Sequence, residues 1–144
     1  MLAGRNLEPL SEDQIANCEA AWQLLCGGVA RELDTTEADR YGSRTRYNEE
    51  RRAVILGADA YPGVGINANA RMSMLACLAH ELAHAERHEA AYGRPFDPPD
   101  SYLDEAETSI RAAFNTVISR VDREHLIEDA RDRLVDWLAE VKEA

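Results

Sequence analysis

Residues 69–93 read NARMSMLACLAHELAHAERHEAAYG, and the rest of the chain is best understood from this stretch. Its apolar residues recur at intervals of three and four, which predicts an amphipathic helix. The residues expected to face the core are Met72, Leu75, Leu78, Ala79 and Leu82. Asn69 is the expected N-cap, and the helix should end near Tyr92, where Gly93 can adopt a left-handed C-cap before Pro95.

The centre of this helix carries the pattern His80-Glu81-Leu82-Ala83-His84. His80 and His84 are four residues apart, so they lie on one face of a helix and both imidazoles can reach one ion. Glu81 lies about 100° around the helix from His80, where its carboxylate can hold and deprotonate a water molecule beside that ion. This H-E-x-x-H spacing is typical of zinc hydrolases. It predicts a Zn²⁺ site with Glu81 as the catalytic base.

A catalytic zinc site usually has three protein ligands and one open position. The position where some families carry a third histidine, six residues after the second, is Ala90. Cys77 lies one turn before His80 on the same helix, and we expect it to be a packed small side chain. His125 falls near the start of another predicted helix. We therefore expect the third ligand to be neither a histidine nor a cysteine.

The remaining source of a third ligand is the segment Asp104-Glu105-Ala106-Glu107-Thr108-Ser109, which begins 20 residues after His84. A proline-rich connection lets its helix run back against the histidine helix. Glu105 is the first choice, because the small residue after it permits close approach; Glu107 and then Asp104 are the alternatives. Acids in a first helical turn also stabilise the N-terminus by a few tenths of a kcal/mol each, which is the expected role of the two that do not bind.

His88 extends the row of histidines, but an ideal helix has rotated by about 80° at its third member. We expect His88 to support a ligand or to face solvent rather than to bind the ion. Ser109, one turn after Glu105, is a candidate for a hydrogen bond to one of the ligands.

Three further helices are predicted. Ser11 and Gln14 form a capping-box pattern before an amphipathic helix of about six turns that should extend to Leu33. Asp100 or Ser101 can cap the acidic helix, whose expected inner face is Ala106, Ile110, Ala113, Phe114, Val117, Ile118 and Val121. Asp122 can cap the last helix. Its apolar stripe, expected to face the core or a partner protein, is Leu126, Ile127, Ala130, Leu134, Trp137, Leu138 and Val141.

Three short strands are predicted between the first helix and the histidine helix. They are Ser43–Asn48, the apolar and partly β-branched Ala53–Leu56, and Val64–Asn67, which should lie at a sheet edge. The expected fold is α+β and mostly helical, with about four helices and a small sheet. We expect residues 1–144 to form a single domain.

Composition narrows the classes of function. The 144 residues are 45% hydrophobic and 30% charged, with a formal net charge of −11, which argues against nucleic-acid or anionic-membrane partners. The local arginines Arg40, Arg44, Arg46, Arg51 and Arg52 are expected to be solvated charges around a strand or turn. No apolar run reaches the roughly 18 residues of a membrane span, and no signal-peptide pattern is visible. Cys18, Cys26 and Cys77 show no pairing pattern, so the expected location is the reducing cytoplasm.

With these pieces in place, the chain resembles the gluzincin metallopeptidases, specifically the compact ImmA/IrrE-like group. The similarity rests on Val64-Gly65-Ile66-Asn67, Arg71, the run from Leu78 to His84, His88, and a glutamate-bearing helix about twenty residues later. Residues 104–109 are similar to the Asn-Glu-Ala-x-Ser-Asp pattern of thermolysin-type enzymes, and Ala112-Ala113-Phe114 is similar to a run in the metallopeptidase part of antirestriction proteins.

This resemblance implies a zincin-like metallopeptidase domain that binds Zn²⁺ through His80, His84 and Glu105, with Ser109 replacing the usual aspartate behind a ligand. The chain departs from the ImmA/IrrE-like pattern because Ala83 replaces a glycine and the Ala-Asn-x-Phe-Ala run is missing. The choice between Glu105 and Glu107 therefore stays open.

The expected function is hydrolysis of peptide bonds in a specific cytoplasmic protein, under the control of narrow specificity or a regulatory protein partner. An extended substrate would pair with the predicted edge strand near residues 63–67. Tyr92, Tyr102 and His125 are the candidates for stabilising the oxyanion. The alternative is a non-catalytic metal-binding module that acts through a protein partner. Metal-dependent hydrolysis of a non-peptide substrate is a third, weaker reading.

Overall fold

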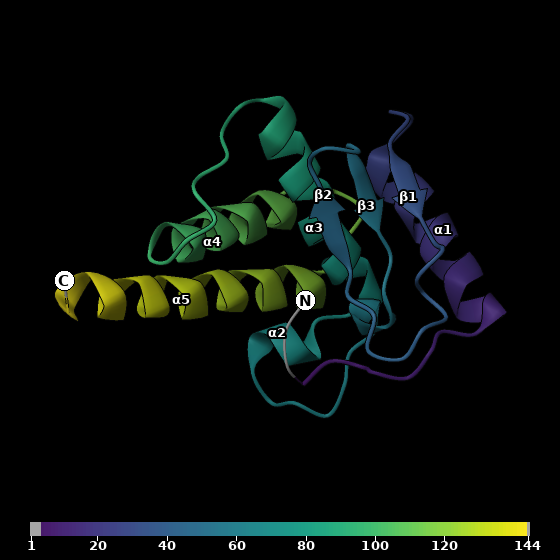
Figure 1. The fold of residues 1–144 in the computed structure, drawn as a ribbon, viewed down its shortest axis with the longest axis horizontal. Helices are drawn as coiled ribbons and strands as arrows, with labels where there is room; N and C mark the ends of the chain where they lie inside the picture. Colours follow the sequence, from purple (N-terminus) through teal and green to yellow (C-terminus); the bar gives the residue numbers. More distant parts are fainter. Residues whose placement is uncertain (1–3, 144) are drawn as a thin grey trace.

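The computed structural model describes residues 4–143 and contains five α-helices, one short 3-10 helix and a three-stranded sheet (Figure 1). In chain order the elements are α1 (Glu12–Cys26), β1 (Glu32–Asp34), β2 (Arg46–Asn48), β3 (Ala53–Ile55), η1 (Ala58–Ala60), α2 (Ala68–Arg71), α3 (Met74–Glu89), α4 (Asp100–Ala113) and α5 (Arg120–Glu143). The predicted α+β, mostly helical fold is confirmed.

Helix α1 begins as predicted and ends earlier. The Ser11 hydroxyl accepts the Gln14 amide proton, and the Gln14 side chain accepts from the Ser11 amide, so the capping box is present. The helix stops at Cys26 because Gly27 and Gly28 both have left-handed backbone conformations, with φ of 59° and 93°. The prediction of six turns was wrong, and Leu33 belongs to a strand instead.

The sheet has the order β1-β3-β2, with β1 parallel and β2 antiparallel to the central strand β3. All three residues of β3 are buried, as expected for an apolar central strand. The predicted strand Val64–Asn67 is instead a loop. Gly65 donates its amide proton to the Gly4 carbonyl, and a side chain at Gly63 would collide with that carbonyl. This close approach of two backbones uses hydrogen bonds that a sheet would need.

Two helices replace the predicted single helix from Asn69. Asn67 caps α2 and Ser73 caps α3, each through a side-chain oxygen that accepts an amide proton. The chain leaves α3 after Glu89, with Ala91 in a left-handed conformation at φ 61°. The predicted caps at Asn69 and Gly93 were therefore wrong, although the helix itself and its buried face are present.

Arg5 fixes the junction between η1, α2 and α3. Its side chain is 4% exposed, and its guanidinium donates to the carbonyls of Asp59, Ala60, Asn69 and Met72 at 2.6–2.8 Å. These hydrogen bonds satisfy backbone oxygens at the ends of two short helices. They also hold the segment before α1 against the start of α3.

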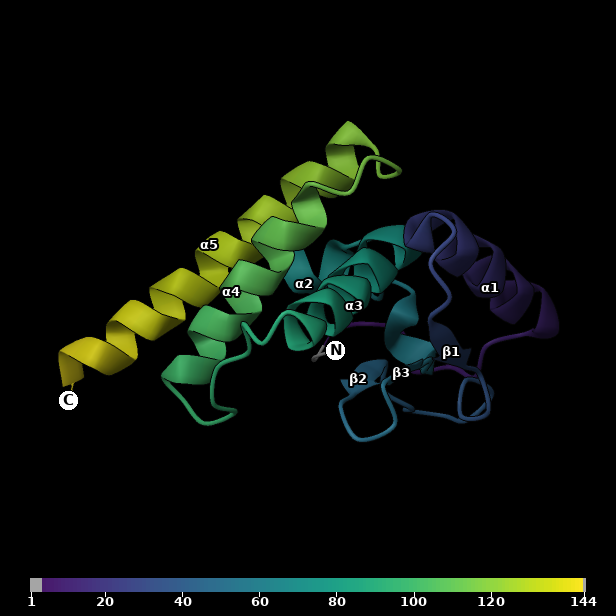
Figure 2. The same cartoon turned by 90° about the horizontal axis from the view of Figure 1, so that it is seen from above.

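Helices α4 and α5 run side by side, and α4 also contacts α3 (Figures 1 and 2). Helix α4 ends at Ala113, so its predicted inner face is shorter than expected, and Phe114, Val117 and Val121 are exposed. Helix α5 begins at Arg120, before the predicted cap Asp122. The backbone amide of Asp122 donates its proton to the Ser119 hydroxyl.

Helix α3 lies at the centre of the molecule, between the sheet and α1 on one side and α4 with α5 on the other (Figure 2). Cys18, Cys26 and Cys77 are buried and free, in agreement with a packing role. No helix within residues 4–143 has both the length and the apolarity needed to cross a membrane.

Candidate metal centre

The two motif histidines point to the same carboxylate. His80 Nε2 lies 3.0 Å from Glu105 Oε2, and His84 Nε2 lies 3.0 Å from Glu105 Oε1. The histidines come from α3 at the predicted four-residue spacing, and Glu105 comes from the second turn of α4. Packing of α4 against α3 therefore assembles the group.

The donor set fits a metal ion. One ligand atom from each of His80, His84 and Glu105 lies within 4.8 Å of the other two. Two imidazole nitrogens with one carboxylate oxygen form a ligand set used by catalytic zinc. The three residues can therefore hold a metal ion.

The same contacts shift the pKa values of His84 and Glu105. Burial alone would lower the pKa of His84, but its hydrogen bond to Glu105 and the charges of Glu105, Glu81 and Asp104 outweigh burial and raise the pKa to about 9. Burial would raise the pKa of Glu105, but hydrogen bonds to both histidines hold it well below its usual range. Without a metal, His84 and Glu105 therefore form a hydrogen-bonded ion pair at neutral pH.

The two alternative carboxylates are engaged elsewhere. Glu107 binds Arg87 at 2.9 Å and Arg94 at 2.6 Å. Asp104 binds Arg87 at 2.8 Å and lies 3.9 Å from His84 Nδ1, on the side of the ring away from Glu105. Of the three acids named from the sequence, the structure brings Glu105 between the histidines.

Hydroxyl groups on α4 face the other nitrogen of each ring. His80 Nδ1 lies 2.8 Å from the Ser109 hydroxyl, and His84 Nδ1 lies 3.4 Å from that of Thr108. Thr108 donates its own proton to the Asp104 carbonyl, and Ser109 donates to Asp129. Each hydroxyl is thus an acceptor toward its histidine, which favours a proton on Nδ1 and leaves Nε2 to face the Glu105 side.

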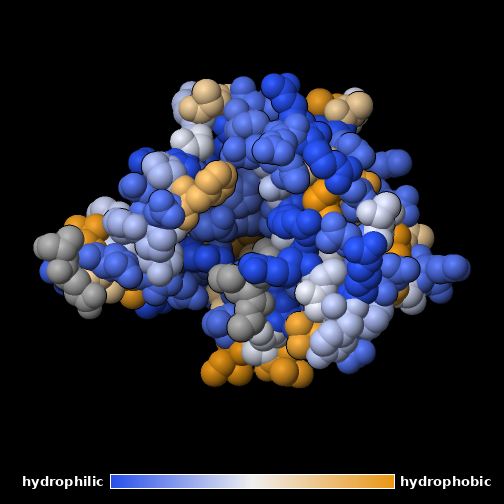
Figure 3. Space-filling view, viewed as in Figure 1, coloured by the Kyte–Doolittle hydropathy of each residue, from blue (hydrophilic) through white to orange (hydrophobic). Residues whose placement is uncertain are grey.

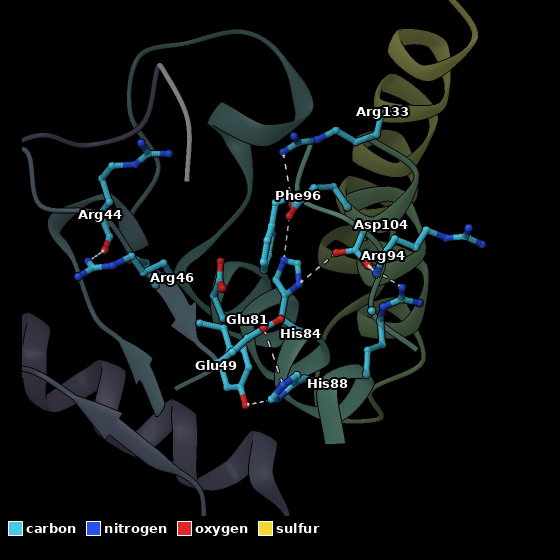
Figure 4. Close-up of a pocket in the computed structure, with 15 residues that line it drawn as sticks. Arg44, Arg46, Glu49, Glu81, His84, His88, Arg94, Phe96, Asp104 and Arg133 are labelled. Atoms are coloured by element: carbon cyan, nitrogen blue, oxygen red, sulfur yellow. Dashed lines mark hydrogen bonds and ion pairs between the residues drawn. The ribbon is translucent and has the colours of Figure 1, made fainter. Parts of the chain in front are cut away.

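The group opens into a cavity of about 320 Å³, seen as a hollow with a hydrophilic rim in Figure 3. Figure 4 shows its walls: β2 and the residues before it lie on one side, and α4 and α5 lie on the other. Lining side chains include Glu81, His84 and Glu105, together with Phe96 from the loop before α4.

Glu81 meets a structural requirement for a base in this cavity. It lines the cavity, yet the residue is only 4% exposed. Among residues 4–143, no hydrogen bond or ion pair to its carboxylate is present in the structure, unlike the arginine-bound carboxylates of Asp104 and Glu107. A carboxylate that no described residue holds can accept a proton from a molecule in the cavity.

His88 and Cys77 are outside the cluster of three candidate ligands. His88 Nδ1 lies 3.1 Å from the Tyr47 hydroxyl, and its Nε2 lies 3.9 Å from Glu49. Burial raises the pKa of the Cys77 thiol to about 12, so this side chain stays protonated. The burial of Cys77 agrees with the packing role expected from the sequence, whereas His88 contacts Tyr47 and Glu49 rather than one of the three candidate ligands.

The structure does not bring Tyr92, Tyr102 or His125 to the described walls of the cavity. It instead supplies Arg133 from α5, whose guanidinium lies 4.0 Å from Glu105 Oε2. Sequence reasoning missed both Arg133 and Asp129. Their four-residue spacing on one predicted helix was the only available signal, and it is common in charged helices.

Comparison with protein-family models, with curated protein sequences and with solved structures found no match to this chain. The functional conclusion therefore rests on the geometry of the cluster and its cavity.

Proposed function

We propose that this protein is a zinc-dependent metallopeptidase whose Zn²⁺ ligands are His80, His84 and Glu105. The observation that supports it most is the convergence of these three side chains beside a cavity that also contains the partly enclosed carboxylate of Glu81. Structural zinc sites normally have four protein ligands and are rich in cysteine. Three ligands next to a cavity fit a catalytic site better.

A bound zinc ion would supply a Lewis acid and lower the pKa of a coordinated water molecule from 15.7 to about 7. Glu81 accepts a proton from the attacking water at its carboxylate and delivers it to the leaving amine nitrogen. The guanidinium of Arg133 provides positive charge beside Glu105, where the carbonyl oxygen of a substrate becomes negative. Arg133 replaces the tyrosines and His125 as our candidate for this role.

The proposed substrate is an extended segment of a specific protein. Strand β2 is an edge strand that pairs with β3 on one side, and its residues Arg46 and Tyr47 line the cavity. A peptide that adds to the other side of β2 runs along this wall, and its backbone can hydrogen-bond to the strand. Strand β2 therefore takes the role first expected of residues 63–67.

A reducing compartment such as the cytoplasm fits three free buried thiols. A non-catalytic, metal-binding interaction module is the second candidate. It is supported by exposed apolar side chains on the C-terminal half of α5, namely Leu134, Val135, Leu138 and Val141, which a protein partner could cover.

Replacement of Glu81 by Gln tests the proposal. We expect Glu81→Gln to bind zinc as the parent protein does and to lose hydrolysis of proteins in a whole-cell lysate, measured as new N-termini by mass spectrometry. The matched control is Glu86→Gln on the outer side of the same helix, where Glu86 pairs with Arg111. Equal cleavage by the parent and Glu81→Gln would refute the proposed base. Zinc binding with no cleavage by the parent would favour the interaction module.

A further inference from the structure

A line of hydrogen bonds leads from His80 to a buried acid on the last helix. His80 Nδ1 lies 2.8 Å from Ser109 Oγ, and Ser109 donates to Asp129 Oδ2 at 2.7 Å. The three residues belong to α3, α4 and α5, and none is more than 1% exposed. Asp129 therefore reaches His80 through Ser109.

The number of protons on each group decides which one donates in each of these hydrogen bonds. A carboxylate only accepts, and a serine hydroxyl has one proton to donate. Because Ser109 donates that proton to Asp129, its oxygen must accept from His80, so Nδ1 of His80 carries a proton. In the metal-free structure Nε2 donates to the Glu105 carboxylate at 3.0 Å, because a carboxylate only accepts. A metal ion would replace that proton on Nε2 and leave the Nδ1–H of the ring on Ser109.

The second oxygen of Asp129 holds a different group. Arg133 Nε lies 3.4 Å from Asp129 Oδ1, one helical turn away, and Arg133 Nη2 lies 4.0 Å from Glu105 Oε2. Arg133 and Asp129 thus form an ion pair along one face of α5. A single buried carboxylate thus contacts both the hydroxyl behind His80 and the cation that faces the cavity.

We propose that Asp129 is a positioning residue of the metal centre, which fixes the Nδ1–H form and the orientation of His80 through the Ser109 hydroxyl and holds Arg133 toward Glu105. The proposal rests on the metal centre of the proposed function. Groups that orient metal-binding histidines in this way typically affect metal affinity or activity about 10- to 100-fold.

Zinc affinity of purified protein, measured by competition with a chelating dye, provides the first readout. We expect Asp129→Asn and Ser109→Ala each to weaken zinc binding about 10- to 100-fold. Asp122→Asn is the matched control, because Asp122 is also a buried acid of α5 that accepts a serine proton, from Ser73 at 2.6 Å, at a distance from the ligands. Its affinity should equal that of the parent protein.

Proton-detected nitrogen NMR of the zinc-loaded protein provides a readout that packing alone would not change. We expect a slowly exchanging Nδ1–H signal from His80 in the parent protein and in Asp122→Asn, and its faster exchange or loss in Ser109→Ala. This signal in the parent protein tests the Nδ1–H form of His80 even if a variant does not fold.

The outcomes separate the two proposals. Absence of zinc binding by the parent protein overturns both the proposed function and the role of Asp129. Zinc binding that is equal in the parent, Asp129→Asn and Ser109→Ala overturns the role of Asp129 alone. An equal loss in Asp122→Asn also overturns it, because the effect would then reflect helix packing. A parent protein whose His80 lacks the Nδ1 proton does the same.

Discussion

Replacement of Glu105 by Gln should change the pKa of His84 in the metal-free protein. Glutamine keeps the size and one acceptor oxygen of Glu105 but removes the negative charge that lies 3.0 Å from His84 Nε2. Burial, which lowers the pKa of a histidine, remains. We therefore expect the pKa of His84 to return from about 9 toward its ordinary value of 6.5.

The raised pKa of His84 determines how much this pair stabilises the folded protein. A rise from 6.5 to about 9 corresponds to about 3 kcal/mol, at about 1.4 kcal/mol per unit. Because the folded-state pKa is raised, this stabilisation is fully present below pH 6.5 and is lost as the pH rises through about 9. The Glu105 carboxylate must also stay ionised. The difference in unfolding free energy between the parent protein and Glu105→Gln should thus be largest near pH 6 and should fall by up to about 3 kcal/mol by pH 10.

Two measurements check this prediction in the presence of a chelator. NMR titration of the His84 ring gives its pKa, and urea unfolding at pH 6 and pH 10 gives the change in stability. Glu107→Gln is the matched control, because Glu107 pairs with Arg87 and Arg94. A His84 pKa that stays near 9 in Glu105→Gln would show that Glu105 does not form the described pair.

Two further predictions concern the framework around the site. Arg5→Met should lower the free energy of unfolding by at least about 3 kcal/mol in urea titrations, because four buried carbonyls lose a charged donor; a loss below 1 kcal/mol would contradict this role. Gly57→Ala should cost about 1–3 kcal/mol, because a Cβ there would overlap the backbone of Arg44 in the cavity wall. Gly93→Ala, which also lies at the cavity and meets nothing within 4 Å, should be close to neutral, and equal losses at both positions would refute the steric argument.

Local patterns predicted the parts of the site that depend on a single helix. The four-residue spacing of His80 and His84 needs only helical geometry, and α3 provides it. Glu105 lies beside the two histidines only because the chain also reverses direction before α4. The proline-rich connection suggested that reversal, but it could not distinguish Glu105 from Glu107. That choice depends on Arg87 and Arg94, which bind Glu107 across the two helices.

Long-range packing determined what the sequence could not predict. Asp129 lies in a run of charged residues, and only the contact of α5 with α4 makes it a buried acid. Leu134 and Leu138 continue the apolar stripe of Leu126 in sequence, yet they are exposed because this half of α5 extends beyond the body of the protein (Figure 1). The short strand Glu32–Asp34 has two acidic residues out of three, so no apolar pattern marked it.

The contribution of α5 to the site has a consequence for the order of biosynthesis. The ribosome makes His80, His84 and Glu105 first, and Asp129 and Arg133 follow more than twenty residues after Glu105. Until α5 has emerged and packed against α4, Ser109 has no carboxylate to donate to and Glu105 has no arginine beside it. A nascent chain of this protein therefore contains its three candidate metal ligands before it contains the groups that we propose orient them.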